Sequence, residues 1–139
     1  DADSIVNDEV FGQLLEMDDD DEEHEFSKSI VINFFEQAHT TFAKMDVAIE
    51  ERDLESYAKL GHFLKGSSAT LGLQKVEQTC EKIQHSQASA HEVSLPEIDG
   101  DAALARGIEL LARLKREYKQ AERHLCRLYE MEPPFSGAQ

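Results

Sequence analysis

Apolar residues recur at helical spacing along most of the chain. Between residues 26 and 51 they alternate in steps of four and three, which places them on one stripe of a helix. This stripe comprises Val31, Phe35, Ala38, Phe42, Met45 and Ile49. The same spacing predicts helices at 53–72, 74–87 and 101–130. The expected seam of the helix at 53–72 is Leu54, Tyr57, Gly61, Leu64, Ser68 and Leu71. The seam expected for 74–87 is Leu73, Val76, Cys80, Ile83 and Gln87. The seam expected for 101–130 is Leu104, Ile108, Leu111, Tyr118, Ala121, Leu125 and Leu128.

Polar and helix-ending residues mark the limits of these segments. Asp53 is expected to cap the helix that follows it, and Gly72 is expected to end that helix. A shorter apolar pattern predicts a helix at 9–17, followed by an acidic connector at 18–25, and residues 131–139 are expected to form a loose tail. No run alternates as a strand would. The sequence therefore predicts one all-α domain, an antiparallel four-helix bundle with an additional short N-terminal helix.

Charge and composition narrow the choice of partners. Fourteen Lys and Arg residues against 29 Asp and Glu residues give a formal net charge of −15 across 139 residues. Such a chain repels polyanions, so we expect no nucleic acid and no membrane as its partner. Two cysteines, Cys80 and Cys126, are too few for a disulfide framework, and no apolar run approaches the ~18 residues of a membrane helix. These features suit a soluble intracellular protein.

Most signatures of enzymes and metal sites are missing from the sequence. No glycine-rich segment has the spacing of a phosphate cradle, and no Cys or His pairs have the spacing of a zinc finger. The six histidines are scattered at positions 24, 39, 62, 85, 91 and 124. We therefore expect no metal site, and a functional site must be built from other groups.

Two glycines lie inside the helix predicted at 53–72, where each costs roughly 1 kcal/mol relative to alanine. On a helical projection of about 100° per residue, Gly61 falls on the apolar seam, where it allows close packing between helices. Gly66 falls almost opposite the seam, one turn after His62 and on the same face. Three further side chains surround this outward face: Lys59, Lys65 and Phe63.

This outward face has the groups that a phosphohistidine site needs. A neutral imidazole is nucleophilic and can form a covalent intermediate. A neighbouring ammonium group stabilises the charge of a transferring phosphoryl group, and the bare backbone at Gly66 lets a second protein close over His62. Two other interpretations stay open at this point. The chain could be an adaptor in which His62 is incidental. It could also be a histidine kinase dimerisation module, but that would need a linked ATP-binding domain with Gly-rich and Asn-containing boxes, for which we expect no room in 139 residues.

The same residues resemble a known family. The histidine-containing phosphotransfer (HPt) domains have the hallmark His-x-x-Lys-Gly-[Ser/Ala], which is matched here by His62-Phe63-Leu64-Lys65-Gly66-Ser67. Three longer blocks, at 17–21, 60–74 and 80–84, resemble the fungal members of this family. The likeness extends over about residues 8–87 and includes a last helix of suitable length.

The resemblance implies a mechanism. His62 would attack, through Nε2, the aspartyl phosphate on the receiver domain of a hybrid sensor kinase, and would then pass the phosphoryl group to an Asp of a response regulator. Lys65 would compensate charge and Gly66 would give clearance. Ser67 and Gln84 would supply hydrogen bonds around the imidazole.

The resemblance also has consequences for cofactors and partners. The Mg²⁺ that the reaction needs would belong to the partner receiver domain, so this chain needs no cofactor. The chain would be a monomeric, stoichiometric carrier without ATP-dependent kinase activity, located in the cytoplasm and also in the nucleus. In the fungal relative an Arg stands four residues after the Gln, where this chain has Ala88, so charge neutralisation is expected to rest more on Lys65 and Lys59.

Apolar residues outside the seams predict a docking surface. A nine-residue helix is not stable alone, so one apolar stripe of the segment 9–17 must pack on the bundle, which leaves the other free. Phe11, Leu15 and Phe34 are expected to cover the end of the core. The residues expected to form one exposed apolar patch beside the histidine, shared by several receivers, are Val10, Leu14, Met17, Phe26, Ile30 and Phe63. In the fungal relative the matching positions meet the receiver domain.

Overall fold

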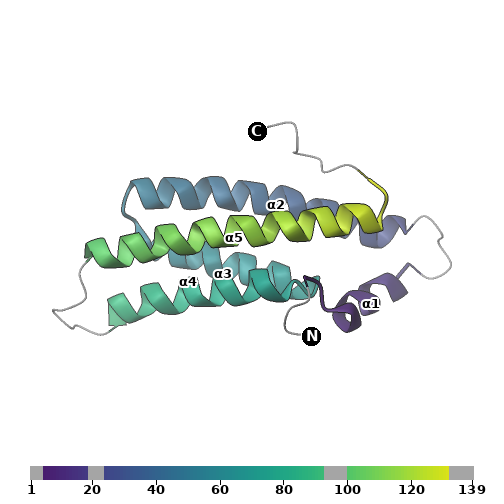
Figure 1. Ribbon diagram of the computed structural model, residues 1–139, viewed down its shortest axis with the longest axis horizontal. Helices are drawn as coiled ribbons and strands as arrows, with labels where there is room; N and C mark the ends of the chain where they lie inside the picture. Colours follow the sequence, from purple (N-terminus) through teal and green to yellow (C-terminus); the bar gives the residue numbers. More distant parts are fainter. Residues whose placement is uncertain (1–4, 19–23, 93–99, 132–139) are drawn as a thin grey trace.

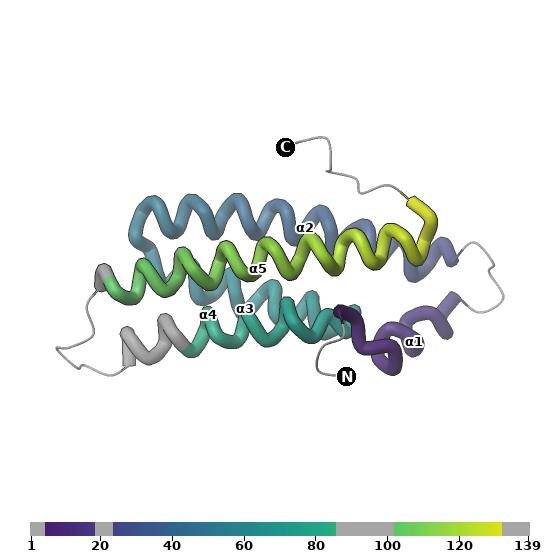
Figure 2. Tube along the Cα trace, viewed as in Figure 1, coloured from purple at the N-terminus to yellow at the C-terminus, as the bar shows by residue number. Residues whose placement is uncertain are grey.

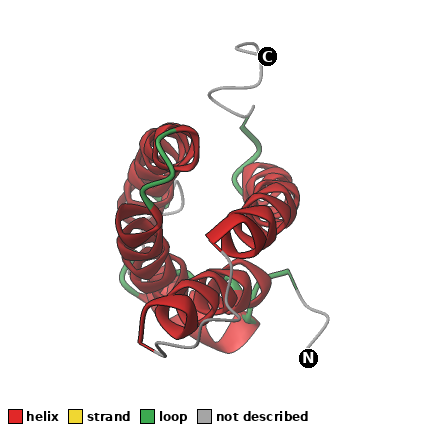
Figure 3. Ribbon diagram, turned by 90° about the vertical axis from the view of Figure 1, so that its left-hand side faces the viewer, coloured by secondary structure: helices red, strands yellow, loops and turns green. Residues whose placement is uncertain are grey.

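Five helices make up the part of the chain that the computed structural model describes, which is the backbone of residues 5–18, 24–92 and 100–131, with side chains except at 86–101. They are α1 (Asp8–Glu16), α2 (Glu25–Glu50), α3 (Leu54–Thr70), α4 (Gln74–Glu92) and α5 (Gly100–Leu128). The four long helices run side by side in alternating directions, and α1 lies at one end (Figures 1 and 2). Viewed end-on, they surround a common core (Figure 3). The predicted all-α bundle is confirmed.

Local capping explains where the helices begin and end. The Asn7 side chain accepts hydrogen bonds from two backbone N–H groups in the first turn of α1. Asp53 caps α3 as predicted, because its carboxylate accepts a hydrogen bond from the Ser56 N–H at 3.1 Å. Gly72, at φ +73°, follows the last turn of α3 in the left-handed conformation that favours glycine. α4 continues to Glu92 rather than ending at 87, since its polar second half contains no helix breaker.

The core lies between the inward stripes of the four long helices. On α2 and α3 the residues that the spacing predicted are buried, except that Ile49 and Leu54 are only partly buried. The α2 helix also buries four residues outside the predicted stripe, Ser27, Phe34, Thr41 and Ala48. On α4 the predicted Val76, Cys80 and Ile83 are buried. The steps of four and three were therefore a sound guide to the core in these three helices.

The seam of α5 differs from the predicted one. Ile108 and Leu128 are 50% and 44% exposed. The first turns of α5 turn the small residues Ala103 and Gly107 inward instead. The Tyr57 hydroxyl of α3 donates to the Gly107 carbonyl at 2.6 Å, so a large ring from α3 fills the space beside these small residues. The spacing of large apolar residues therefore predicts the wrong seam in the first turns of α5, because the large side chain there is Tyr57 of α3.

α1 closes the end of the bundle at the turn between α3 and α4. The Asn7 N–H donates to the Gly72 carbonyl at 2.7 Å, and Phe11 packs edge-on against Tyr129 with ring centroids 6.3 Å apart. Phe11 and Leu14 are 3% and 7% exposed and belong to the common core. Their burial holds in place a nine-residue helix that would not be stable alone.

Asp18 is a structural residue, although the acidic run around it predicted a solvated connector. Its carboxylate is buried and accepts hydrogen bonds from the Ser27 N–H at 2.9 Å and the Ser27 hydroxyl at 2.7 Å. His24 Nδ1 lies 2.9 Å from the same carboxylate, and the Tyr129 hydroxyl donates to Ser27 Oγ at 2.7 Å. This Asp18 network joins the end of α1, the start of α2 and the residue after α5.

No helix in the described ranges is both long and apolar enough to cross a membrane. The rest of the predicted acidic connector, at 19–23, and the predicted tail from residue 132 onward lie outside the residues that the structure describes.

Candidate functional site

His62 lies on the outward face of α3, near the middle of the helix. Its side chain is exposed, and no hydrogen bond, ion pair or ring contact reaches it from any residue that the structure describes. Gly66 lies one turn further along the same face and is also exposed. Apart from its chain neighbours and the backbone of its own helical turns, a Cβ placed on Gly66 would meet no described atom within 4 Å. A second protein can therefore approach the imidazole over open backbone.

Gly61 has the opposite environment, since it faces α4. A Cβ at this position would lie 3.1 Å from Ile83 Cγ2 and 3.6 Å from the Cys80 carbonyl oxygen. Ile83 is fully buried, so it has little room to yield. The two expectations about glycine are confirmed, with close helix packing at Gly61 and open surface at Gly66.

Lys65 reaches from α3 toward α4. Its Nζ lies 4.0 Å from Glu81 Oε1, and His85 Nε2 lies 3.9 Å from the same oxygen. The side chains of Lys65 and Glu81 are 32% and 48% exposed, so water screens this pair considerably. Lys65 was predicted as a cation near His62, but Glu81 was missed, because a contact between two helices leaves no signal in the spacing along either one.

The nearest thiol on this flank is not a competing nucleophile. Burial, followed by the carboxylates of Glu117 and Glu77, raises the pKa of Cys80 to about 12, although Lys65 acts in the opposite direction. Because the thiolate is the reactive form of cysteine, the Cys80 side chain stays protonated and inert at neutral pH. Nor do three or more His, Cys, Asp or Glu side chains come together as a possible metal site anywhere in the described ranges.

Ser67 lies on the opposite flank of α3, toward α2. Its hydroxyl lies 3.4 Å from two acceptors, Gln37 Oε1 and the Phe63 carbonyl oxygen. Gln84 is half-buried on α4. Neither Ser67 nor Gln84 hydrogen-bonds to the His62 imidazole, so their predicted contribution at the ring is not visible here and stays a prediction. The side chain of Ala88 lies outside the described part of the chain.

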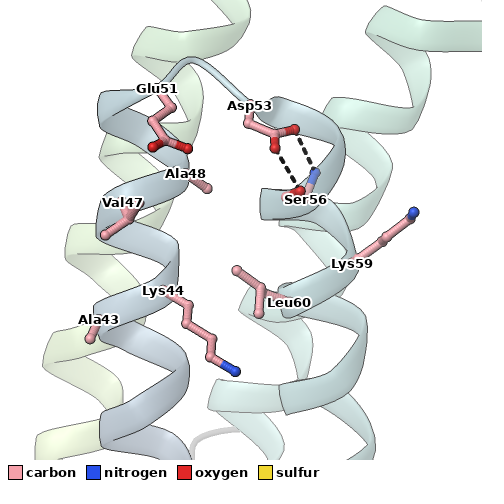
Figure 4. A pocket seen from close by; sticks show the side chains of 9 residues that line it. All are labelled: Ala43, Lys44, Val47, Ala48, Glu51, Asp53, Ser56, Lys59 and Leu60. Carbon is pink, nitrogen blue, oxygen red and sulfur yellow. Dashed lines mark hydrogen bonds between the residues drawn. The ribbon is translucent and has the colours of Figure 1, made fainter.

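Lys59, the second predicted cation, is more exposed than Lys65. Its Nζ pairs with Glu55 of the preceding turn at 3.5 Å, and its side chain is 76% exposed. Figure 4 shows Lys59 pointing outward at the rim of a groove of about 550 Å³ between α2 and α3, whose lining includes Val47 and Leu60. Lys65, at 32% exposed, is therefore the less screened of the two cations that flank His62.

Other histidines have different surroundings from His62. Three lie beside acidic side chains: His24 beside Asp18 at 2.9 Å, His39 beside Glu122 at 3.5 Å and His85 beside Glu81 at 3.9 Å. His39 also packs against Tyr118 with ring centroids 5.6 Å apart, so it belongs to the contact between α2 and α5. His124 is half-buried, and the side chain of His91 is not described.

Exposed apolar side chains extend from His62 toward α1. Phe63, Phe26 and Met17 are 51%, 49% and 64% exposed. Ile30, one turn after Phe26 on α2, is half-buried and lines a groove of about 270 Å³ with Ser67 of α3. We call Met17, Phe26, Ile30 and Phe63 the docking surface.

Neighbouring residues link the members of the docking surface to one another. Ser67 lies one turn after Phe63, and the groove connects it to Ile30. At the other end, the hydrogen bonds from Ser27 to Asp18 hold the neighbouring residues Phe26 and Met17 together. The docking surface thus runs from the phosphoacceptor candidate to the end of the bundle.

Two residues predicted for this patch lie elsewhere or are partly covered. Leu14 is 7% exposed and packs in the core, so its prediction as a surface residue is wrong. Phe11 and Leu14 are three residues apart and therefore share one helix face, which is the face that α1 buries. Val10 is half-buried beside the turn at Gly72, where a Cβ on that glycine would lie 3.1 Å from the Val10 Cβ. Phe34 and Leu15 cover the core as expected.

Comparison with known proteins identifies a family likeness that covers most of the bundle. The family model described as Hpt domain matches residues 29–124. Multistep phosphorelay regulator 1 of Schizosaccharomyces pombe is 46% identical over 127 residues, which are 91% of this chain and 43% of the relative. Phosphorelay intermediate protein YPD1 of Saccharomyces cerevisiae is 48% identical over 82 residues, 58% of this chain and 48% of the relative. The chain thus matches less than half the length of these curated relatives.

Solved structures agree with the sequence comparison. The crystal structure of yeast Ypd1p superposes with a TM-score of 0.81 at 30% identity, covering 93% of this chain and 96% of that chain. A co-crystal structure of Saccharomyces cerevisiae Ypd1 with the receiver domain of its downstream response regulator Ssk1 gives a TM-score of 0.80 at 32% identity, with 92% and 96% covered.

Proposed function

The chain belongs to the Hpt domain family, and we propose that it is a histidine phosphotransfer protein whose phosphoacceptor is His62. The observation that carries the proposal is the exposed His62 imidazole, which no described group binds, next to the open backbone of Gly66. A nucleophile that must enter the active site of another protein needs both features. An adaptor would need neither.

From this chain the transfer requires only the imidazole, charge compensation and room for the partner. His62 Nε2 attacks the phosphorus of an aspartyl phosphate, the new P–N bond forms as the P–O bond breaks, and the electron pair stays on the freed carboxylate. Nδ1 keeps its proton, so the phosphorylated ring carries the positive charge that balances the freed carboxylate. Lys65 stabilises the phosphoryl oxygens as charge redistributes, and Gly66 leaves room for the partner. Transfer to the next receiver is the reverse of this step.

The proposed partners are receiver domains of a hybrid histidine kinase and of response regulators. The relative Ypd1 has been crystallised with such a domain, and the docking surface of this chain provides exposed apolar area beside the phosphoacceptor. An apolar surface suits several receiver domains that bind one at a time. Apolar contact gives affinity for all of them, and charges at the rim make the affinity differ from one receiver to another. Any Mg²⁺ is expected in the receiver, and this chain is expected to act as a monomer in cytoplasm and nucleus.

A phosphoryl transfer assay tests the proposal. The chain is incubated with a receiver domain labelled on its Asp, and acid-labile, base-stable label is measured on wild type and on His62→Gln. We expect label on wild type and none on His62→Gln, with unchanged melting because His62 is exposed. His85→Gln, an exposed histidine on α4, is the matched control and should label normally. Label on His62→Gln would assign the phosphate elsewhere, and an unlabelled wild type would favour an adaptor.

ATP provides a second test of the carrier function. The sequence has no phosphate cradle, so the chain incubated with ATP and Mg²⁺ should gain no phosphate by mass spectrometry. Autophosphorylation under these conditions would contradict the proposal.

Light scattering and imaging of a fluorescent fusion check the expected monomer and its location in cytoplasm and nucleus.

A further inference from the structure

We propose that Glu81 is a positioning residue that draws Lys65 toward α4 and so keeps the phosphohistidine short-lived. The inference rests on the proposed function of His62 and adds an opposing residue to that site. It follows from the ion pair between Lys65 and Glu81, which gives Lys65 an anionic partner before any phosphoryl group is bound to His62.

The geometry gives Lys65 two possible anions. Lys65 follows His62 by three residues, so the two side chains are neighbours on α3, with Cβ atoms about 5–6 Å apart in an ideal helix. Its ammonium group nevertheless lies 4.0 Å from Glu81 Oε1 on α4.

Competition for this single cation affects the phosphorylated state alone. A phosphoryl group on Nε2 brings two negative charges beside Lys65, whose ammonium then divides between the phosphoryl oxygens and the Glu81 carboxylate. The more Lys65 pairs with Glu81, the less it stabilises the phosphohistidine. Removing the charge of Glu81 should therefore stabilise the phosphorylated state relative to the free one, by the modest factor typical of a partly exposed ion pair, about two- to fivefold.

Such an opposing carboxylate suits a carrier that must both accept and release. If Lys65 were fully available to the phosphoryl group, the phosphohistidine would be more stable and slower to transfer onward. Glu81 lowers that stability without touching the imidazole. Glu81 on α4 thus shifts the equilibrium between aspartyl phosphate on the receiver and phosphohistidine on this chain.

The half-life of the phosphohistidine tests this inference. Wild type, Glu81→Gln and Lys65→Ala are labelled from a phosphorylated receiver domain, separated from it, and followed for loss of acid-labile label at pH 8, above the usual titration range of histidine. We expect a half-life two- to fivefold longer for Glu81→Gln, shorter for Lys65→Ala, and a smaller difference in 1 M salt. Glu109→Gln is the matched control, because Glu109 is an exposed acid that pairs with Arg106 at 3.9 Å on α5. It should leave the half-life unchanged.

A double variant shows whether Glu81 acts through Lys65. In the Lys65→Ala background, Glu81→Gln should change the half-life no further. A persistent effect there, or an unchanged or shorter half-life for Glu81→Gln alone, would overturn the inference. Thermal melts and a Glu81→Ala variant separate these outcomes from misfolding. A wild-type chain that takes no label on His62 refutes the proposed function itself, whereas normal labelling with no effect of Glu81 refutes only this inference.

Discussion

Gly61 and Gly66 lie five residues apart on α3, and the same substitution at the two positions should have opposite effects. Gln at position 66 would project into open surface, so Gly66→Gln should raise the free energy of unfolding by about 0.5–1 kcal/mol through better helix propensity. Gln at position 61 would be forced against the buried Ile83, so Gly61→Gln should lower it by roughly 2 kcal/mol or more. Urea unfolding measures both.

The rate of phosphoryl transfer should depend on the two substitutions in the opposite way: the stable variant should transfer slowly and the destabilised one at the normal rate. Gly66→Gln should slow transfer from a receiver severely, because the new side chain occupies the approach to His62. The folded fraction of Gly61→Gln should keep its transfer rate, since position 61 faces α4. Normal transfer by Gly66→Gln would contradict the clearance role of this glycine.

Ser68 is a fully buried residue of α3 whose hydroxyl has no hydrogen-bond partner among the residues that the structure describes. A buried unsatisfied hydroxyl lowers stability, so Ser68→Ala should raise the free energy of unfolding by about 1 kcal/mol. Ser67→Ala is the matched control on the neighbouring, more exposed position, and should change stability by less than about 0.5 kcal/mol. A loss of stability in Ser68→Ala would mean that its hydroxyl is bonded in solution.

At the scale of the helices, the Asp18 network makes stability depend on pH. Burial alone would raise the pKa of Asp18, but the hydrogen bonds from Ser27 and His24 together lower it below the usual range. A pKa that is lower in the folded state stabilises the fold above the unfolded value, near 4, and this contribution disappears as pH falls through the folded value. Asp18→Asn should therefore be less stable than wild type at pH 7, and the difference should shrink below about pH 4.

Urea midpoints of wild type and Asp18→Asn at pH 7, 5 and 3 check this expectation. The two proteins should differ at pH 7 and pH 5 and converge toward pH 3. A constant difference at all three values would show that Asn breaks the network through its shape rather than its charge. Equal midpoints at pH 7 would show that the network contributes nothing to stability.

Local periodicity predicted three of the four long helices well and erred where neighbours decide the outcome. In α2 the alternating steps of four and three identified a stripe that the structure buries. In α5 the same rule selected Ile108, which is half exposed, because it could not anticipate that Tyr57 of α3 fills the space beside Gly107. In α1 two apolar stripes were available, and only contact with the bundle decides that Leu14 lies inside.

The candidate site shows the same division between local and distant information. The exposure of His62 and Gly66 follows from their angle to the apolar seam, so it could be predicted from one helix. Glu81 and Gln37 reach the site from α4 and α2, and their contacts depend on how three helices pack. Asp18 was hidden for another reason, since one buried carboxylate has the same sequence signal as the acids next to it.

At the scale of the whole molecule, the fold separates residues that hold α1 in place from residues that remain available to a partner. Phe63→Ala removes an exposed ring beside His62, so the melting temperature should change little. Affinity for every receiver domain should fall by roughly 1–3 kcal/mol if Phe63 is a central contact of the docking surface. Leu14→Ala removes a core side chain and should lower the free energy of unfolding by about 2 kcal/mol or more. Calorimetric titration and thermal melts of both variants measure this contrast.

Ile108 provides the matched control, because it is exposed to the same extent as Phe63 but lies on α5. Ile108→Ala should change neither melting nor affinity, which would show that loss of exposed apolar area alone does not weaken binding. The folded fraction of Leu14→Ala should still bind receivers with an affinity close to that of wild type, since Met17 and Phe26 of the docking surface stay exposed. If Phe63→Ala bound normally while Ile108→Ala bound poorly, the receiver would dock over α5, and the docking surface beside His62 would be wrong.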